Sequence, residues 1–146
     1  MSRLPHGAPR RLEDLREWLI ASGFRTTSDV RGGMGGLQLS MIGQVPHRPD
    51  SPLAEIEITA DRSDWAVALR FEGMTRFINA AVWAAYVVGS PVGAPDPVSG
   101  ASFLVAHLAD AADSFMDHKS AEADLIALGA DYMRGRYRFL SDLNRR

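Results

Sequence analysis

The fold is decided by residues 54–71, which read AEIEITADRSDWAVALRF. Apolar and polar residues alternate on both sides of the central Asp-Arg-Ser-Asp, which is the period of a strand with one buried face. The apolar positions are Ala54, Ile56, Ile58 and Ala60, then Trp65, Val67, Leu69 and Phe71. Two such runs joined by a short polar break predict an antiparallel β-hairpin with one face on the core.

Two more strands and a helix are expected on the N-terminal side of this hairpin. Residues 37–42 alternate in the same way, and residues 24–30 form a weaker strand rich in threonine. The glycine-rich segment 32–36 between them predicts a hairpin with a loose tip. Residues 43–52 hold three prolines and are expected to be loop. Leucines at helical spacing predict a first helix over residues 11–22.

On the C-terminal side, the spacing of the apolar residues changes to that of a helix. Residues 75–88 are almost wholly apolar, which predicts a central helix lying across the sheet and buried on more than one side. The proline-rich stretch 89–100 is expected to be loop, and two helices are expected over residues 101–117 and 120–140. The predicted fold class is therefore α+β: an N-terminal helix, a three- to four-stranded antiparallel sheet, then three helices packed on one face.

Length and composition indicate one globular domain. The chain has 146 residues, of which 46% are hydrophobic and 23% charged. We expect residues 1–10 to be a flexible segment and residues 11–146 to form a single domain. The absence of cysteine excludes disulfides and suits a reducing compartment. No signal-peptide pattern and no apolar run of ~20 residues is present, so we expect a cytoplasmic protein without membrane contact.

Residues suited to catalysis or cofactor binding do not form a recognisable motif. The glycines at 32–36 are not followed by Lys-Ser/Thr and do not open a helix, so they are not expected to bind phosphate. His107 and Asp110 form a possible ligand pair, but His118 would lie about 16 Å away along an unbroken helix, too far to share a metal ion. We predict no catalytic residue, no cofactor and no metal. A net charge of −2 gives no reason to expect nucleic acid as a partner.

The residues predicted to contact a protein partner are three aspartates on one helix, a methionine at a hairpin tip and one tryptophan. Asp110, Asp113 and Asp117 lie within one arc of a predicted helix, and a basic partner would be steered toward their charge. Met34 stands at the tip of the glycine-rich hairpin, where glycine lets another backbone approach. Trp83 falls off the apolar stripe of its helix, so it is either wedged in the core or exposed as a binding anchor.

Three motifs follow one another between residues 54 and 110. They are Asp61-Arg62-x-x-Trp65 at the hairpin turn, a tryptophan-containing helix over residues 77–88, and Gly-Ser-Pro-Val-Gly from Gly89. Together they resemble small immunity proteins of bacterial polymorphic toxin systems. The resemblance implies a protein that neutralises a cognate toxin by direct binding and has no catalytic motif. Two alternatives stay open: a chaperone-like adaptor for a secreted protein, and an enzyme with a site assembled from distant segments.

Overall fold

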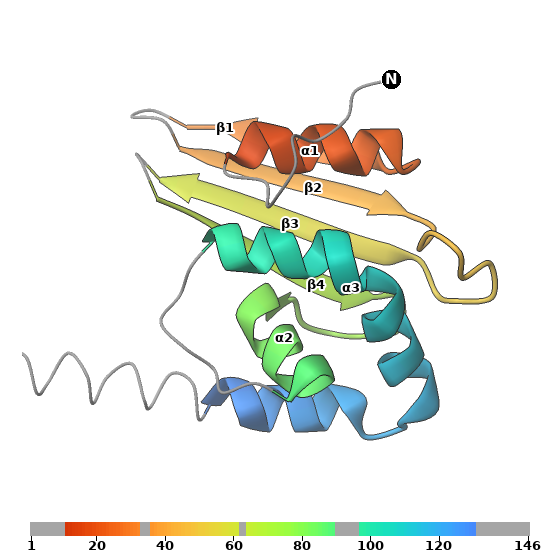
Figure 1. Cartoon of the computed structure of the whole chain (residues 1–146). Helices are drawn as coiled ribbons and strands as arrows, with labels where there is room; N and C mark the ends of the chain where they lie inside the picture. The colour runs from red at the N-terminus through yellow and green to blue at the C-terminus, as the bar shows by residue number, and fades with distance from the viewer. Residues whose placement is uncertain (1–10, 33–35, 62–63, 90–96, 131–146) are drawn as a thin grey trace, which may run out of the picture.

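The computed structural model describes residues 11–32, 36–61, 64–89 and 97–130 (Figure 1). Residues 1–10 and 131–146, and with them the predicted flexible segment and the end of the last helix, lie outside this part. The elements in chain order are α1 (Leu12–Ala21), β1 (Arg25–Arg31), β2 (Leu37–Gly43), β3 (Ala54–Asp61), β4 (Asp64–Phe71), β5 (Ile78–Asn79), α2 (Ala80–Val88) and α3 (Pro97–Asp117). A further helical segment covers residues 121–130. This order confirms the predicted α+β class.

The strands form a single antiparallel sheet in which each strand pairs with its neighbours in sequence, in the order β1-β2-β3-β4-β5. The hairpin predicted over residues 54–71 is confirmed, with Ile56 opposite Leu69 and Ile58 opposite Val67. In the described part of the chain the sheet has five strands, one more than the largest number predicted. The additional strand, β5, has 2 residues, which is too short to leave a period in the sequence.

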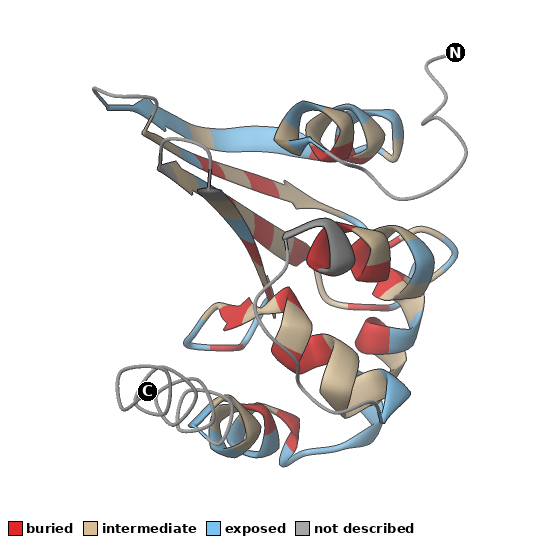
Figure 2. Cartoon of the chain, turned by 60° about the vertical axis from the view of Figure 1, so that its left-hand side comes forward, coloured by how far each residue is buried: buried red, intermediate tan, exposed pale blue. Residues whose placement is uncertain are grey.

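One face of the sheet is buried under the helices. In Figures 1 and 2, α1 lies over β1 and β2 while α3 lies over β3 and β4, all on the same side. The buried strand residues occupy alternate positions because successive side chains point to opposite faces. The fully buried side chains include Leu15 and Leu19 of α1, Leu39 and Met41 of β2, Ile56 and Ile58 of β3, Leu69 and Phe71 of β4, and Leu104 of α3.

The helix predicted over residues 75–88 is shorter than expected and lies elsewhere. α2 begins at Ala80, because the Asn79 side chain caps it by accepting a hydrogen bond from the Ala81 N–H at 2.8 Å. α2 packs mainly against α3. The central helix across the sheet is therefore α3 rather than α2 (Figure 1). The predicted position of the apolar helix across the sheet was wrong, because a helix of this composition can be buried between other helices as well as on a sheet.

The third helix starts earlier than predicted and is bent. α3 begins at Pro97, inside the stretch expected to be loop, and proline suits the first turn of a helix because its missing N–H has no partner there. His107 interrupts α3 with φ −131° and ψ 15°. Figure 1 shows the two halves of α3 running in different directions. None of the helices in the described ranges is both long and apolar enough to cross a membrane.

The second face of the sheet is not covered by any described helix (Figure 2). Its side chains are held together by polar contacts between neighbouring strands. Arg70 Nη2 donates to Glu55 Oε2 at 2.9 Å, and the same guanidinium lies 4.3 Å above the centre of the Phe77 ring. Gln38 Nε2 donates to Glu57 Oε2 at 3.4 Å. These contacts use polar residues that alternate with core residues along β2, β3 and β4.

Candidate functional site

The loop between β2 and β3 is built from two consecutive turns. The Arg48 N–H donates to the Val45 carbonyl at 3.2 Å, and the Ser51 N–H donates to the Arg48 carbonyl at 3.1 Å. Each turn has proline as its second residue, where the fixed φ of proline favours a turn. His47 is the third residue of the first turn and has φ +63°, the left-handed value that a type II turn requires there.

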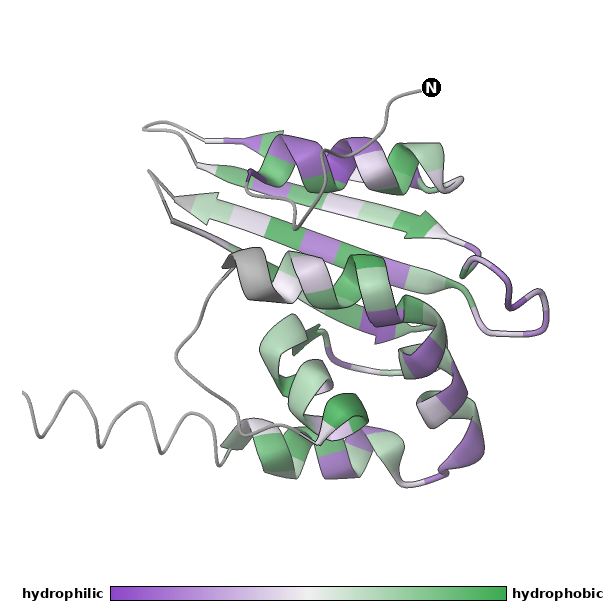
Figure 3. Cartoon of the chain, in the orientation of Figure 1, coloured by the Kyte–Doolittle hydropathy of each residue, from purple (hydrophilic) through white to green (hydrophobic). Residues whose placement is uncertain are grey.

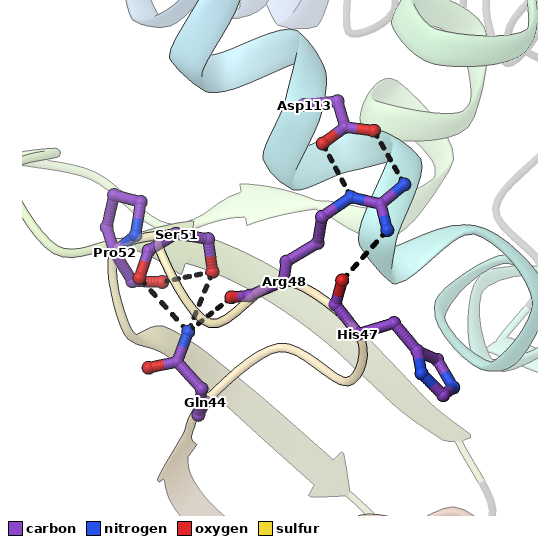
Figure 4. A network of polar contacts seen from close by, with 6 residues as sticks. All are labelled: Gln44, His47, Arg48, Ser51, Pro52 and Asp113. Atoms are coloured by element: carbon purple, nitrogen blue, oxygen red, sulfur yellow. Dashed lines mark hydrogen bonds and ion pairs between the residues drawn. The ribbon is translucent and has the colours of Figure 1, made fainter.

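Gln44 ties the two turns to each other. Its Nε2 donates to the Arg48 carbonyl at 2.7 Å, the Ser51 carbonyl at 3.1 Å and the Ser51 Oγ at 3.0 Å (Figure 4). Ser51 is the one buried polar residue in the described part of the chain, and this contact satisfies it. The prolines and the Gln44 contacts therefore give this polar loop a defined shape.

Arg48 and Asp113 fasten this loop to α3. Arg48 Nε donates to Asp113 Oδ1 at 2.8 Å, and Arg48 Nη2 donates to Asp113 Oδ2 at 2.9 Å, a bidentate ion pair (Figure 4). The hydrogen bond from Arg48 lowers the pKa of the Asp113 carboxyl below its ordinary value. We call this contact the Arg48–Asp113 clasp. It neutralises one of the three aspartates that were predicted to attract a basic partner.

The other two aspartates remain on the surface. The acidic arc, defined as Asp110, Asp113 and Asp117, lies on the half of α3 that follows the bend. Asp110 Oδ2 is 2.9 Å from His107 Nδ1, a contact that becomes an ion pair only when the imidazole is protonated. Asp117 is exposed at the end of α3. Figure 3 shows hydrophilic residues along both this half of α3 and the loop clasped to it.

Trp83, which was also predicted as a possible partner contact, does not join the acidic arc. Trp83 is completely buried, and its Nε1 donates to the Leu69 carbonyl at 2.9 Å. Its prediction as an exposed anchor is wrong, and the core alternative is the one observed. The burial follows from the position of α2 between β4 and α3, which sequence periodicity did not reveal. Met34 lies outside the described residues.

The histidines do not form the arrangement expected of an unbroken helix. His107 lies at the bend between the two halves of α3, and His118 lies beyond the C-terminal end of α3. The His107 ring instead stacks on Phe103, with ring centres 5.6 Å apart. Within the described ranges, no three side chains of histidine, aspartate or glutamate are grouped closely enough to hold a metal ion.

Glu122 makes a contact that sequence analysis missed. Its Oε2 accepts hydrogen bonds from the Thr75 N–H at 2.6 Å, the Thr75 Oγ1 at 3.1 Å and the Arg76 N–H at 3.3 Å. These bonds join the last helical segment to the turn before β5 and lower the pKa of Glu122, chiefly through the Thr75 N–H. Glu122 stands near the start of a helix, where its sequence position indicates a favourable dipole interaction but no distant partner.

The lowered pKa of Glu122 predicts a loss of stability in acid. Its pKa falls from an ordinary value of 4.5, so its contribution is complete above that pH and disappears as the pH falls through the lowered pKa. We expect Glu122→Gln to reduce the free energy of unfolding near pH 7 but to match the parent protein well below the lowered pKa. Urea denaturation across this range measures the difference. Thr75→Ala is the control and should keep most of the pH dependence, since two of the three bonds come from main-chain N–H groups. Equal pH profiles for Glu122→Gln and the parent protein would show that Glu122 does not cause the loss of stability in acid.

Comparison of the chain with protein-family models, curated proteins and solved structures gives no match.

Proposed function

We propose that this chain is a protein-binding domain that neutralises a cognate toxin by direct binding, with the acidic arc as its contact surface. The observation that supports this is the fixed placement of exposed carboxylates on α3. The Arg48–Asp113 clasp joins the adjoining loop to α3, and the Gln44 contacts join the two turns of the loop to each other. A pre-formed surface loses little conformational freedom when it binds, which favours affinity.

The charges of this surface favour a basic partner. Asp110 and Asp117 are exposed, whereas Asp113 is already paired with Arg48. Exposed carboxylates raise the rate at which a positively charged protein is captured and oriented, and a basic active-site rim would be such a partner. The proposal places the protein in the cytoplasm, a reducing compartment that suits a chain with no cysteine.

The proposal predicts that the two exposed aspartates control binding. With the product of an adjacent toxin-like reading frame as the probe, Asp110→Asn/Asp117→Asn should lower the association rate at low salt by about tenfold and weaken protection of cells. Both side chains are at the surface, so stability should change by less than about 0.5 kcal/mol. Surface plasmon resonance at several salt concentrations measures the rate.

The matched control removes the same charge elsewhere. Glu13 and Glu17 are exposed on α1, and Glu13→Gln/Glu17→Gln should leave both the association rate and protection within about twofold of the parent. Equal losses in the two double variants would show only an effect of net charge. Complete failure of the parent to bind or protect would refute the proposed function itself.

A further inference from the structure

Within the described residues, β1 is an edge of the sheet that no further strand pairs with, and it is exposed along its length. Every residue of β1 is exposed except Ser28, which is intermediate. Val30 is one of the few large apolar residues on the described surface, with 57% of its area exposed. An open edge presents unpaired N–H and C=O groups to which another strand can be added. Which strand this edge can accept depends on the groups that it presents.

The hydrogen bonds of the β1–β2 hairpin show which main-chain groups point outward. The Gly32 N–H donates to the Gly36 carbonyl at 2.9 Å, so this is a hydrogen-bonded position of the ladder. Such positions alternate in an antiparallel pair. Val30 opposite Gln38 therefore bonds to β2, whereas the N–H and C=O groups of Asp29 and Arg31 point away from the sheet.

Charge selects one register for a second β1 strand that pairs with this edge. Antiparallel pairing requires residues with outward main-chain groups to face each other. If Asp29 faced Asp29 of the second copy, or Arg31 faced Arg31, like charges would be opposed, which is unfavourable. Asp29 facing Arg31 opposes unlike charges, and the symmetry of the pair produces this contact twice. Val30 then faces Val30 of the second copy across the dyad.

We propose that two copies of this chain associate through β1 in this register, giving one sheet that continues through both copies. Asp29 and Arg31 already approach each other within one chain, with 3.3 Å between Oδ1 and Nε, so both side chains lie on one face. Val30 lies on the opposite face, where the pairing covers its exposed area. In Figures 1 and 2, the C-terminal end of β1 extends past α1.

The first test compares two exposed valines. Sedimentation equilibrium of the full chain at increasing concentration should show a reversible dimer of micromolar or weaker affinity, as a small interface predicts. Val30→Lys should weaken dimerisation by at least about tenfold, because two ammonium groups would face each other at the dyad. Val88→Lys is the control: Val88 is 52% exposed at the end of α2, a helix that lies away from β1 (Figure 1), so the dimer should persist.

The second test exchanges the charges. Asp29→Arg and Arg31→Asp should each weaken the dimer by about tenfold, and the double variant Asp29→Arg/Arg31→Asp should restore it, since each pair is then opposite in charge again. The absence of cysteine from the parent allows Val30→Cys as a direct probe. Facing Cα atoms at such a position are about 4.5 Å apart, within the range of a disulfide. Val30→Cys should therefore form a covalent dimer much faster than Val88→Cys.

Three results would overturn the proposal. They are a monomer at every concentration up to about the millimolar range, a dimer that survives Val30→Lys, and a double charge exchange that does not restore association. A monomer that still binds and neutralises its toxin through the acidic arc would remove this interface and leave the proposed function intact. A dimer that does not bind the toxin would support this interface and refute the proposed function.

Discussion

Trp83→Ala lowers the free energy of unfolding by about 3–5 kcal/mol, as expected when a large aromatic side chain is removed from a packed core. The indole is fully buried, meets the Phe71 ring edge-on at 5.5 Å between ring centres, and donates its N–H to Leu69. Phe71 in turn stacks on Phe115 at 5.3 Å. Removing the indole leaves a cavity where β4, α2 and α3 meet. Urea denaturation followed by far-ultraviolet circular dichroism measures the loss.

Two further substitutions separate the causes of this effect. Trp83→Phe keeps a ring but removes the N–H that bonds to Leu69, and we expect it to cost about 1–2 kcal/mol. Trp18→Ala is the control, because Trp18 is only partly buried on α1 and should cost clearly less than Trp83→Ala. Similar losses for Trp18→Ala and Trp83→Ala would show that the indole of Trp83 is not the centre of the core.

Gly43→Ala is expected to destabilise the protein by about 1–3 kcal/mol, although it adds only one methyl group. A Cβ atom at Gly43 would lie 2.6 Å from Cγ of Phe24 and 2.8 Å from its Cδ1. Phe24 is 4% exposed and packs in the core, so the ring has no free space into which it can move. The overlap therefore has to displace the end of β2 or the residue that leads into β1.

A double-mutant cycle tests whether Phe24 is the cause. In a Phe24→Ala background, Gly43→Ala should have almost no further effect, giving a coupling energy close to its full cost. Gly129→Ala is the matched control, since its nearest neighbour would be Val82 Cγ2 at 4.0 Å, and alanine in a helix should be neutral or stabilising by up to about 1 kcal/mol. Additive effects at Gly43 and Phe24 would contradict the close packing of the ring on the glycine.

The parts of the fold that were predictable are those specified by local patterns. The β3–β4 hairpin was evident because both strands alternate over a full length and a polar turn joins them. The start of α2 was not evident, because residues 75–79 are compatible with a helix by composition and only the structure shows that Asn79 caps the helix. The bend at His107 has no local signal, since neither glycine nor proline stands there.

Of the contacts at the candidate site, only the aspartates of α3 were predictable from the sequence. The spacing of Asp110, Asp113 and Asp117 placed them on one arc, and the structure does place them on one half of α3. Their partners could not be found in the same way, because Arg48 is 65 positions away in sequence from Asp113. Glu122 and Thr75 are likewise separated by 47 positions. Contacts at such distances depend on the packing of the chain, which periodicity does not describe.

The strand order of the sheet has a consequence for the rate at which the chain folds. Since each strand pairs only with its neighbours in sequence, the sheet can grow by adding one hairpin after another, and each step closes a short loop. Chains dominated by such local pairings fold faster than those whose strands come together from distant segments. The packing of α1 against α3 brings together a helix that precedes all five strands and a helix that follows them. That docking closes a much longer loop than any of the hairpins does, so its entropic penalty is larger and we expect it to occur late in folding.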